Sequence, residues 1–87
     1  MNESTLGIGE VANLFGITTK TVRFYETVGL VAPERAENDY RRFGPAHIRQ
    51  LLRIRQLQAL GLSLQQIRDI LENELNADRW QMILQTV

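Results

Sequence analysis

The sequence predicts a small, mainly α-helical domain in which a helix-turn-helix is followed by a β-hairpin and further helices. Three observations lead to this prediction. Apolar residues recur at helical spacing over 8–15, glycines at 16, 29, 44 and 61 divide the chain into short segments, and a polar run at 34–39 interrupts the helical pattern.

The first helix is expected over 8–15. Its inward face is formed by the residues at i, i+3, i+4 and i+7, which are Ile8, Val11, Ala12 and Phe15. Gly16 should end this helix, because glycine adopts the left-handed conformation at a helix C-terminus at little cost.

The second helix is expected to begin after Thr18, whose hydroxyl can accept a backbone N–H, and to reach about Val28. A small Ala12, a turn Gly16 and an apolar Val22 are typical of two steeply crossing helices in a helix-turn-helix. A generic helical hairpin is the alternative for these three positions.

Residues 31–43 predict a β-hairpin. A polar stretch with the turn-favouring pair Asn38-Asp39 lies between 31–32 and 40–43. Because a two-stranded ribbon is marginally stable alone, it should lean on the helices and expose its tip.

A third helix should begin with Pro45 at its first position, and Ser63 with Gln66 predicts a capping box that begins a fourth. The third helix is rich in apolar residues whose series drifts around the helix, so it should pack on more than one neighbour and form the centre of the core; they are Ile48, Leu51, Leu52, Ile54, Leu57 and Leu60. The fourth helix should direct Leu64, Ile67, Ile70, Leu71 and Leu75 inward. A break is expected at 76–78, followed by a fifth helix with Trp80, Ile83, Leu84 and Val87 on one face.

Composition narrows the function. The 87 residues have a formal net charge of zero, but 20–55 contain eight basic and four acidic residues, so one face can be positive. With no Cys and a single His47, neither a disulfide nor a thiolate metal site can form within the chain, and no nucleophile with a base is evident. We therefore expect no enzyme activity and no cofactor.

We also expect no membrane segment and a cytoplasmic location, because no long apolar run is present.

Four segments in register resemble the N-terminal DNA-binding domain of the MerR family of bacterial transcription regulators. They are Ile-Gly-Glu-Val-Ala at 8–12, Arg-Phe-Tyr-Glu with Val-Gly-Leu at 23–30, Tyr-Arg-Arg-Phe at 40–43, and Leu-Gly-Leu-Ser-Leu at 60–64 leading to Ile67. The resemblance covers about 6–75. It implies a winged helix-turn-helix DNA-binding domain at 5–74, with the motif at about 8–27, the wing at about 31–43 and a helix pair at 46–73. The start of a truncated dimerisation helix is implied at 78–87.

The resemblance also implies partners. Such regulators bind double-stranded DNA as homodimers at a dyad operator, and they distort it so that RNA polymerase can use the promoter, which fits indirect readout. Two alternatives remain: an architectural, excisionase-like protein that bends DNA without sensing an effector, and a protein-interaction module that uses the Arg-rich face.

The resemblance places the recognition-helix and wing contacts on residues of 18–25 and 40–42. Arg23 suits a guanine edge, whereas Lys20 and the wing arginines suit phosphates. The complete set of candidate DNA-binding residues is Thr18, Thr19, Lys20, Thr21, Arg23, Tyr25, Tyr40, Arg41, Arg42 and Arg53.

For other residues nearby, we expect roles other than a direct contact with DNA. Phe24 and Phe43 should lie in the core, and His47 should lie at the surface. Tyr25 could pack on the first helix rather than contact DNA. Glu26 should orient Arg23 or another cation, because phosphates repel a carboxylate.

The sequence departs from the family's metal sensors, which commonly carry a Cys near the start of the fifth helix. Residues 76–80 read Asn-Ala-Asp-Arg-Trp, so a thiolate site is unsupported. The dimerisation residues would be Trp80, Ile83, Leu84 and Val87, a seam too short for a stable dimer. We therefore expect a DNA-binding fragment, or pairing that depends on DNA or another partner.

Overall fold

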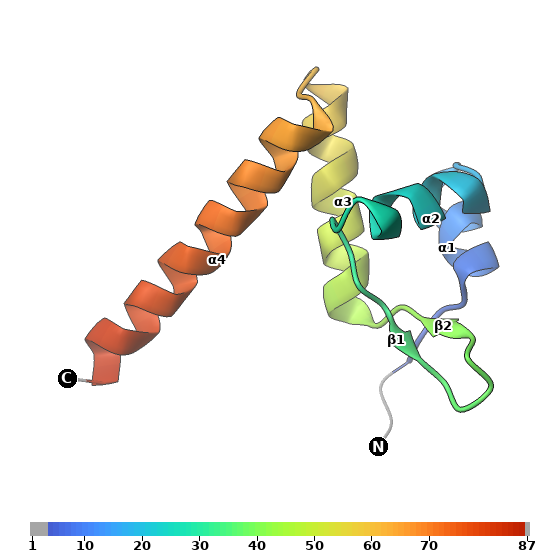
Figure 1. The fold of residues 1–87 in the computed structure, drawn as a ribbon, viewed down its shortest axis with the longest axis horizontal. Coiled ribbons are helices and arrows are strands. Elements are labelled where there is room, and N and C mark those ends of the chain that lie inside the picture. The colour runs from blue at the N-terminus through green and yellow to red at the C-terminus, as the bar shows by residue number, and fades with distance from the viewer. Residues whose placement is uncertain (1–3, 87) are drawn as a thin grey trace. The chain divides into compact units, whose positions relative to one another are not determined.

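The computed structural model describes residues 4–86; within the last helix, the side chains of Leu75, Arg79, Trp80 and Thr86 lie outside the described part (Figure 1). The described residues form four helices and one two-stranded antiparallel sheet. In chain order these are α1 (Ile8–Phe15), α2 (Thr19–Thr27), β1 (Glu34–Arg35), β2 (Arg41–Arg42), α3 (Pro45–Ala59) and α4 (Leu64–Thr86). The chain divides into two compact units, Met1–Arg55 and Gln56–Val87, with the boundary inside α3.

The first unit begins with the expected helix-turn-helix. Gly16 has φ = 66°, and the N–H of Ile17 donates to the carbonyl of Ala12 at 2.9 Å, which closes the end of α1. Ala12 and Val22 are both buried, as predicted for the crossing of α1 and α2. The hydroxyl of Thr18 accepts from the N–H of Thr21 at 3.1 Å, so it caps α2 as expected.

The hairpin is shorter than the sequence suggests. Val31 and Ala32 lie outside the strands, and Val31 is buried in the core. The tip is a three-residue loop in which the N–H of Ala36 donates to Tyr40 O at 2.9 Å and Asp39 has φ = 66°. Such a loop requires one residue in the left-handed region, and Asp tolerates it better than most residues.

A bridge that the sequence did not predict holds the base of the hairpin. Leu6 pairs with Phe43 through reciprocal backbone hydrogen bonds of 2.9 and 2.8 Å. Phe43 has an exposed fraction of 0%, so the prediction that its ring lies in the core is confirmed. Figure 1 shows the hairpin beside the chain that leads into α1, with its turn projecting from the unit.

The core of the first unit draws on both helices of the motif, on the segment after α2, on the residue after β2 and on α3. Its buried residues are Val11, Ala12, Val22, Tyr25, Leu30, Val31, Phe43, Leu51 and Ile54. The apolar series of α3 is not buried throughout, since Leu52 is exposed. It follows Leu51 by one residue, about 100° around the helix.

The second unit contains the end of α3 and α4. Ser63 and Gln66 form the predicted capping box, with bonds of 3.2 Å from Gln66 N to Ser63 Oγ and 2.8 Å from Ser63 N to Gln66 Oε1. Leu57 and Ile67 are buried as expected, whereas Leu60 is exposed.

The predicted break at 76–78 and the separate fifth helix are wrong, because α4 is continuous from Leu64 to Thr86. Asn and Asp are weak helix formers, but each costs well under 1 kcal/mol relative to Ala, and no Gly or Pro forces an end. Ile83 and Leu84 of the expected dimerisation seam are exposed. The side chain of Trp80, and Val87 altogether, lie outside the described residues.

Within residues 4–86, no helix combines the length and the apolar character needed to cross a membrane.

Candidate nucleic-acid interface

The start of α2 presents the predicted recognition residues. Lys20 and Arg23 are exposed, and Thr19 and Thr21 are half-buried. The hydroxyls of Thr18 and Thr21 lie 3.0 Å apart and form a hydrogen bond. Thr18 is therefore exposed at the surface, and its hydroxyl also caps α2.

Two neighbouring aromatic residues of α2 differ in burial. Tyr25 is 1% exposed, and its hydroxyl accepts a hydrogen bond from Arg55 Nη1 at 3.3 Å. The packing alternative for Tyr25 is thus favoured over a DNA contact. Phe24, predicted to lie in the core, is 49% exposed, so that prediction is wrong. The buried face of α2 passes through Val22 and Tyr25, three residues apart, and Phe24 lies off it.

The hairpin forms the predicted wing and carries three candidate residues. Tyr40 is 73% exposed, and its backbone N–H donates to Asn38 Oδ1 at 3.2 Å, which fixes the chain at this point. Arg42 is exposed, whereas Arg41 is half-buried. The three side chains therefore differ in access, although they follow one another in sequence.

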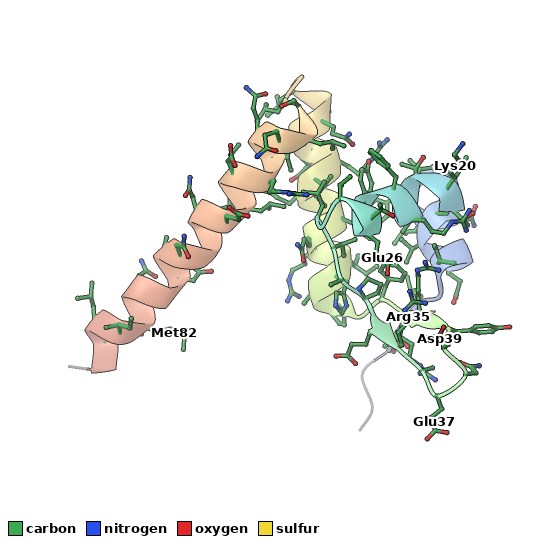
Figure 2. All side chains as sticks on the ribbon, in the orientation of Figure 1. Lys20, Glu26, Arg35, Glu37, Asp39 and Met82 are labelled. Carbon is green, nitrogen blue, oxygen red and sulfur yellow. The ribbon has the colours of Figure 1, made fainter. Side chains whose placement is uncertain are left out.

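Glu26 connects α2 with the wing. Its carboxylate accepts from Arg41 Nε at 2.5 Å and from Arg35 Nη2 at 3.1 Å. Figure 2 shows Glu26 on α2 beside Arg35 of the wing, while Lys20 projects from the first turn of the same helix. Glu26 thus orients a cation, as expected, but the cations belong to the wing and not to α2.

This contact also relates Arg23 to the wing. Residues three apart on a helix are neighbours on its surface, so Arg23 lies on the face next to Glu26. Because Glu26 touches Arg41, the wing borders the side of α2 that exposes Arg23. The helix α2 and the wing are therefore adjacent parts of one surface of the first unit.

The remaining candidate, Arg53, is exposed on α3, as is Arg49 one turn earlier. Gln50 Nε2 donates to the carbonyl of Leu30 at 2.5 Å and connects α3 with the segment after α2. The expectation that His47 lies at the surface holds only in part. It is half-buried, its Nδ1 accepts from Gly44 N at 3.0 Å, and its ring meets that of Phe43 edge-on at 6.3 Å.

Sequence reasoning missed Arg35, which joins β1 to both Glu26 and the hairpin turn. The signal that would have found it is the strand register, in which Arg35 stands directly opposite Arg41. Two arginines in such a pair need an anion nearby. Each strand has only two residues, so the alternation of polar and apolar side chains along the sequence cannot predict this register.

The sequence matches the family described as "MerR HTH family regulatory protein" over residues 6–74. Among curated proteins, it is 34% identical over 74 residues to the HTH-type transcriptional regulator HmrR of Rhizobium leguminosarum bv. viciae, covering 85% of this chain and 57% of that protein. It is 40% identical over 62 residues to the HTH-type transcriptional regulator CueR of Escherichia coli O6:H1, covering 70% of this chain and 46% of that protein. The chain thus spans about half the length of these curated relatives.

Solved structures share the fold. HiNmlR, a MerR family regulator lacking the sensor domain and solved bound to promoter DNA, matches with a TM-score of 0.78 and 27% identity, over 92% of this chain and 65% of that one. The transcription regulator PbrR691 of Ralstonia metallidurans CH34, solved in complex with lead(II), matches with a TM-score of 0.70 and 33% identity, over 93% of this chain and 71% of that one. With the family match extending from the residue that pairs with the wing to the middle of α4, the chain belongs to the MerR HTH family of regulatory proteins.

Proposed function

We propose that the chain is a sequence-specific, double-stranded-DNA-binding transcriptional regulator of the MerR type. The observation that carries the proposal is the joining of two exposed cationic elements in one unit. The helix α2 exposes Lys20 and Arg23, and Glu26 of the same helix holds the wing that exposes Arg42. A helix of this kind fits the DNA major groove, while a neighbouring wing reaches the flanking phosphates.

The side chains suggest different tasks. The guanidinium of Arg23 can donate two hydrogen bonds to O6 and N7 of guanine, so it is our candidate for base readout. Lys20, Arg41 and Arg42 suit phosphates, which position the protein without reading sequence. The exposed hydroxyl of Tyr40 can donate to a phosphate in the same way.

The regulatory step follows from pairing two such units. We infer that two copies bind a dyad operator in the cytoplasm, with the exposed Ile83 and Leu84 of α4 contributing to the pairing, and that the dimer distorts the DNA for RNA polymerase. HiNmlR, whose structure includes promoter DNA, supports a promoter as the site of action. The proposal requires no catalytic step and no cofactor.

A selection experiment tests the proposal. The chain is mixed with a random-sequence duplex library, bound DNA is recovered over several rounds, and affinities for the enriched duplex and for a scrambled duplex are compared. Arg23→Ala should lose about 1–3 kcal/mol of discrimination between them, because a base contact is removed. Arg42→Ala should weaken binding to both duplexes by a similar factor, because a phosphate contact is removed.

Equal loss of discrimination in the two variants would contradict this division of roles. Absence of binding to any duplex at low salt would favour the protein-interaction alternative. If the chain bends its enriched duplex strongly but leaves transcription from a promoter containing that sequence unchanged, it acts as an architectural protein.

A further inference from the structure

The carboxylate of Glu26, on α2, is bonded to both strands of the wing. One oxygen accepts from Arg41 Nε of β2, and the other accepts from Arg35 Nη2 of β1. The side chain of Glu26 is 24% exposed, and that of Arg41 is 23% exposed. An ion pair that is largely withdrawn from water is screened less by salt than one at the surface.

The strand register gives this carboxylate a specific task. Arg35 and Arg41 stand opposite each other in the hairpin, and like charges in that position destabilise a strand pair. Glu26 places one oxygen on each guanidinium, so a single carboxylate offsets the repulsion between the strands. Without it, the hairpin would hold two facing cations next to α2.

The contact extends from α2 to the tip of the wing. Arg35 Nη1 donates to the carbonyl of Asp39 at 3.0 Å, and Asp39 is the loop residue with φ = 66°. The next residue is Tyr40, which is exposed and is a candidate DNA contact. Glu26, Arg35 and the carbonyl of Asp39 therefore form a chain of charge-assisted bonds from the recognition helix to the turn.

Backbone contacts also hold the wing. The Leu6–Phe43 bridge fixes the base of the hairpin, after β2 has ended. The strands themselves contain two residues each, and a ribbon of this size is marginally stable alone. Within residues 4–86, the ion pairs of Glu26 add a side-chain link from both strands to α2.

We propose that Glu26 is a positioning residue for DNA binding: its carboxylate sets the wing against α2, so that both can engage one duplex. The inference rests on the DNA binding proposed above. It also assigns Arg35 a role, as the cation that transmits this position from Glu26 to the turn.

Removing the charge of Glu26 should change the affinity for DNA in the direction opposite to the one that electrostatic repulsion alone predicts. A carboxylate near the interface repels phosphates, so its removal should tighten DNA binding if charge alone matters. If Glu26 positions the wing, Glu26→Gln should weaken binding even though the protein becomes more positive. Glu37→Gln is the matched control, because it removes the same charge at the exposed hairpin tip, outside the ion pairs of Glu26 (Figure 2).

The affinities are measured by fluorescence anisotropy on the duplex enriched by the wild-type chain. Glu26→Gln is expected to bind about tenfold more weakly than wild type, the scale of a lost charge-assisted hydrogen bond. Glu37→Gln should bind equally well or more tightly. Equal or tighter binding by Glu26→Gln would overturn the inference.

Amide hydrogen exchange distinguishes positioning from a general loss of stability. In Glu26→Gln, the wing amides of Ala36 and Tyr40 should exchange faster, while those of Val11 and Val22 in the buried helix pair should keep their wild-type rates. Weaker binding with unchanged wing exchange would also contradict the inference.

Should Glu26→Gln fail to fold, Arg35→Gln is the second variant, since it removes one of the two ion pairs at a side chain that is 40% exposed. It should accelerate exchange at the wing amides and weaken binding by a smaller factor; normal exchange and affinity would overturn the inference. If the wild-type chain enriches no duplex, the proposed function fails, and the exchange measurement still tests whether Glu26 positions the wing.

Discussion

At the scale of single residues, burial separates two phenylalanines that the sequence treats alike. Phe43 is completely buried at the base of the wing, whereas Phe24 is about half exposed on α2. Each phenylalanine follows an arginine, so residue type and sequence neighbours do not predict which of the two is buried. Their difference arises from which side of each element faces the core.

This difference can be measured as unfolding free energy. Phe43→Ala should lower the free energy of unfolding by about 3–5 kcal/mol, because it leaves a cavity where a buried ring was. Phe24→Ala should cost less than about 1 kcal/mol, since its site is partly in water already. Urea denaturation of the two variants provides the test, and equal losses would show that Phe24 is part of the folded core.

At the scale of elements, glycines decide where the helix-turn-helix bends. Gly16 has φ = 66°, and a Cβ added there would meet no atom within 4 Å outside its chain neighbours. The cost of a side chain at this position would therefore come from the backbone conformation and not from clashes with other residues. Gly9 lies inside α1, and a Cβ there would also meet nothing within 4 Å. The two positions therefore test backbone conformation without changing packing.

We expect Gly16→Ala and Gly9→Ala to change stability in opposite directions. Gly16→Ala should destabilise by about 1–2 kcal/mol, because alanine is strained in the left-handed region. Gly9→Ala should stabilise by up to about 1 kcal/mol, because alanine favours the helix. Thermal unfolding measures both effects, and a stabilising Gly16→Ala would contradict the assignment of the α1 C-terminus.

The same elements show how far sequence reasoning extends. The bounds of α1, the Thr18 cap, the Ser63 capping box and the hairpin turn were predictable, because each depends on residues at most a few positions apart. The continuity of α4 was not, since weak helix formers such as Asn76 and Asp78 are tolerated when no residue forces an end.

The candidate site was predictable only in part, for a related reason. The exposure of Lys20, Arg23 and Arg42 was predictable from the positions of these residues in the expected helix and hairpin. The ion pairs of Glu26 join residues 9 and 15 positions apart, and they depend on the register of a hairpin with two-residue strands. Such contacts are set by the tertiary structure and carry no local pattern.

At the scale of the whole molecule, a net charge of zero coexists with a basic segment at 20–55. Binding to DNA releases counterions according to the number of phosphates contacted, not according to the total charge of the protein. Three cations are our candidates for phosphate contacts: Lys20, Arg41 and Arg42. The logarithm of the binding constant should therefore fall with the logarithm of salt concentration with a slope of about −3 per protomer.

The location of the charge, rather than its sum, should determine this slope. Arg42→Ala is expected to reduce its magnitude by about 1, because one phosphate contact is lost. Arg68→Ala, in α4, removes the same charge from the second unit and should leave the slope unchanged. Titrations of both variants between about 50 and 200 mM salt measure this. If the two variants lower the slope equally, the net charge of the molecule governs binding, and the wing makes no specific phosphate contact through Arg42.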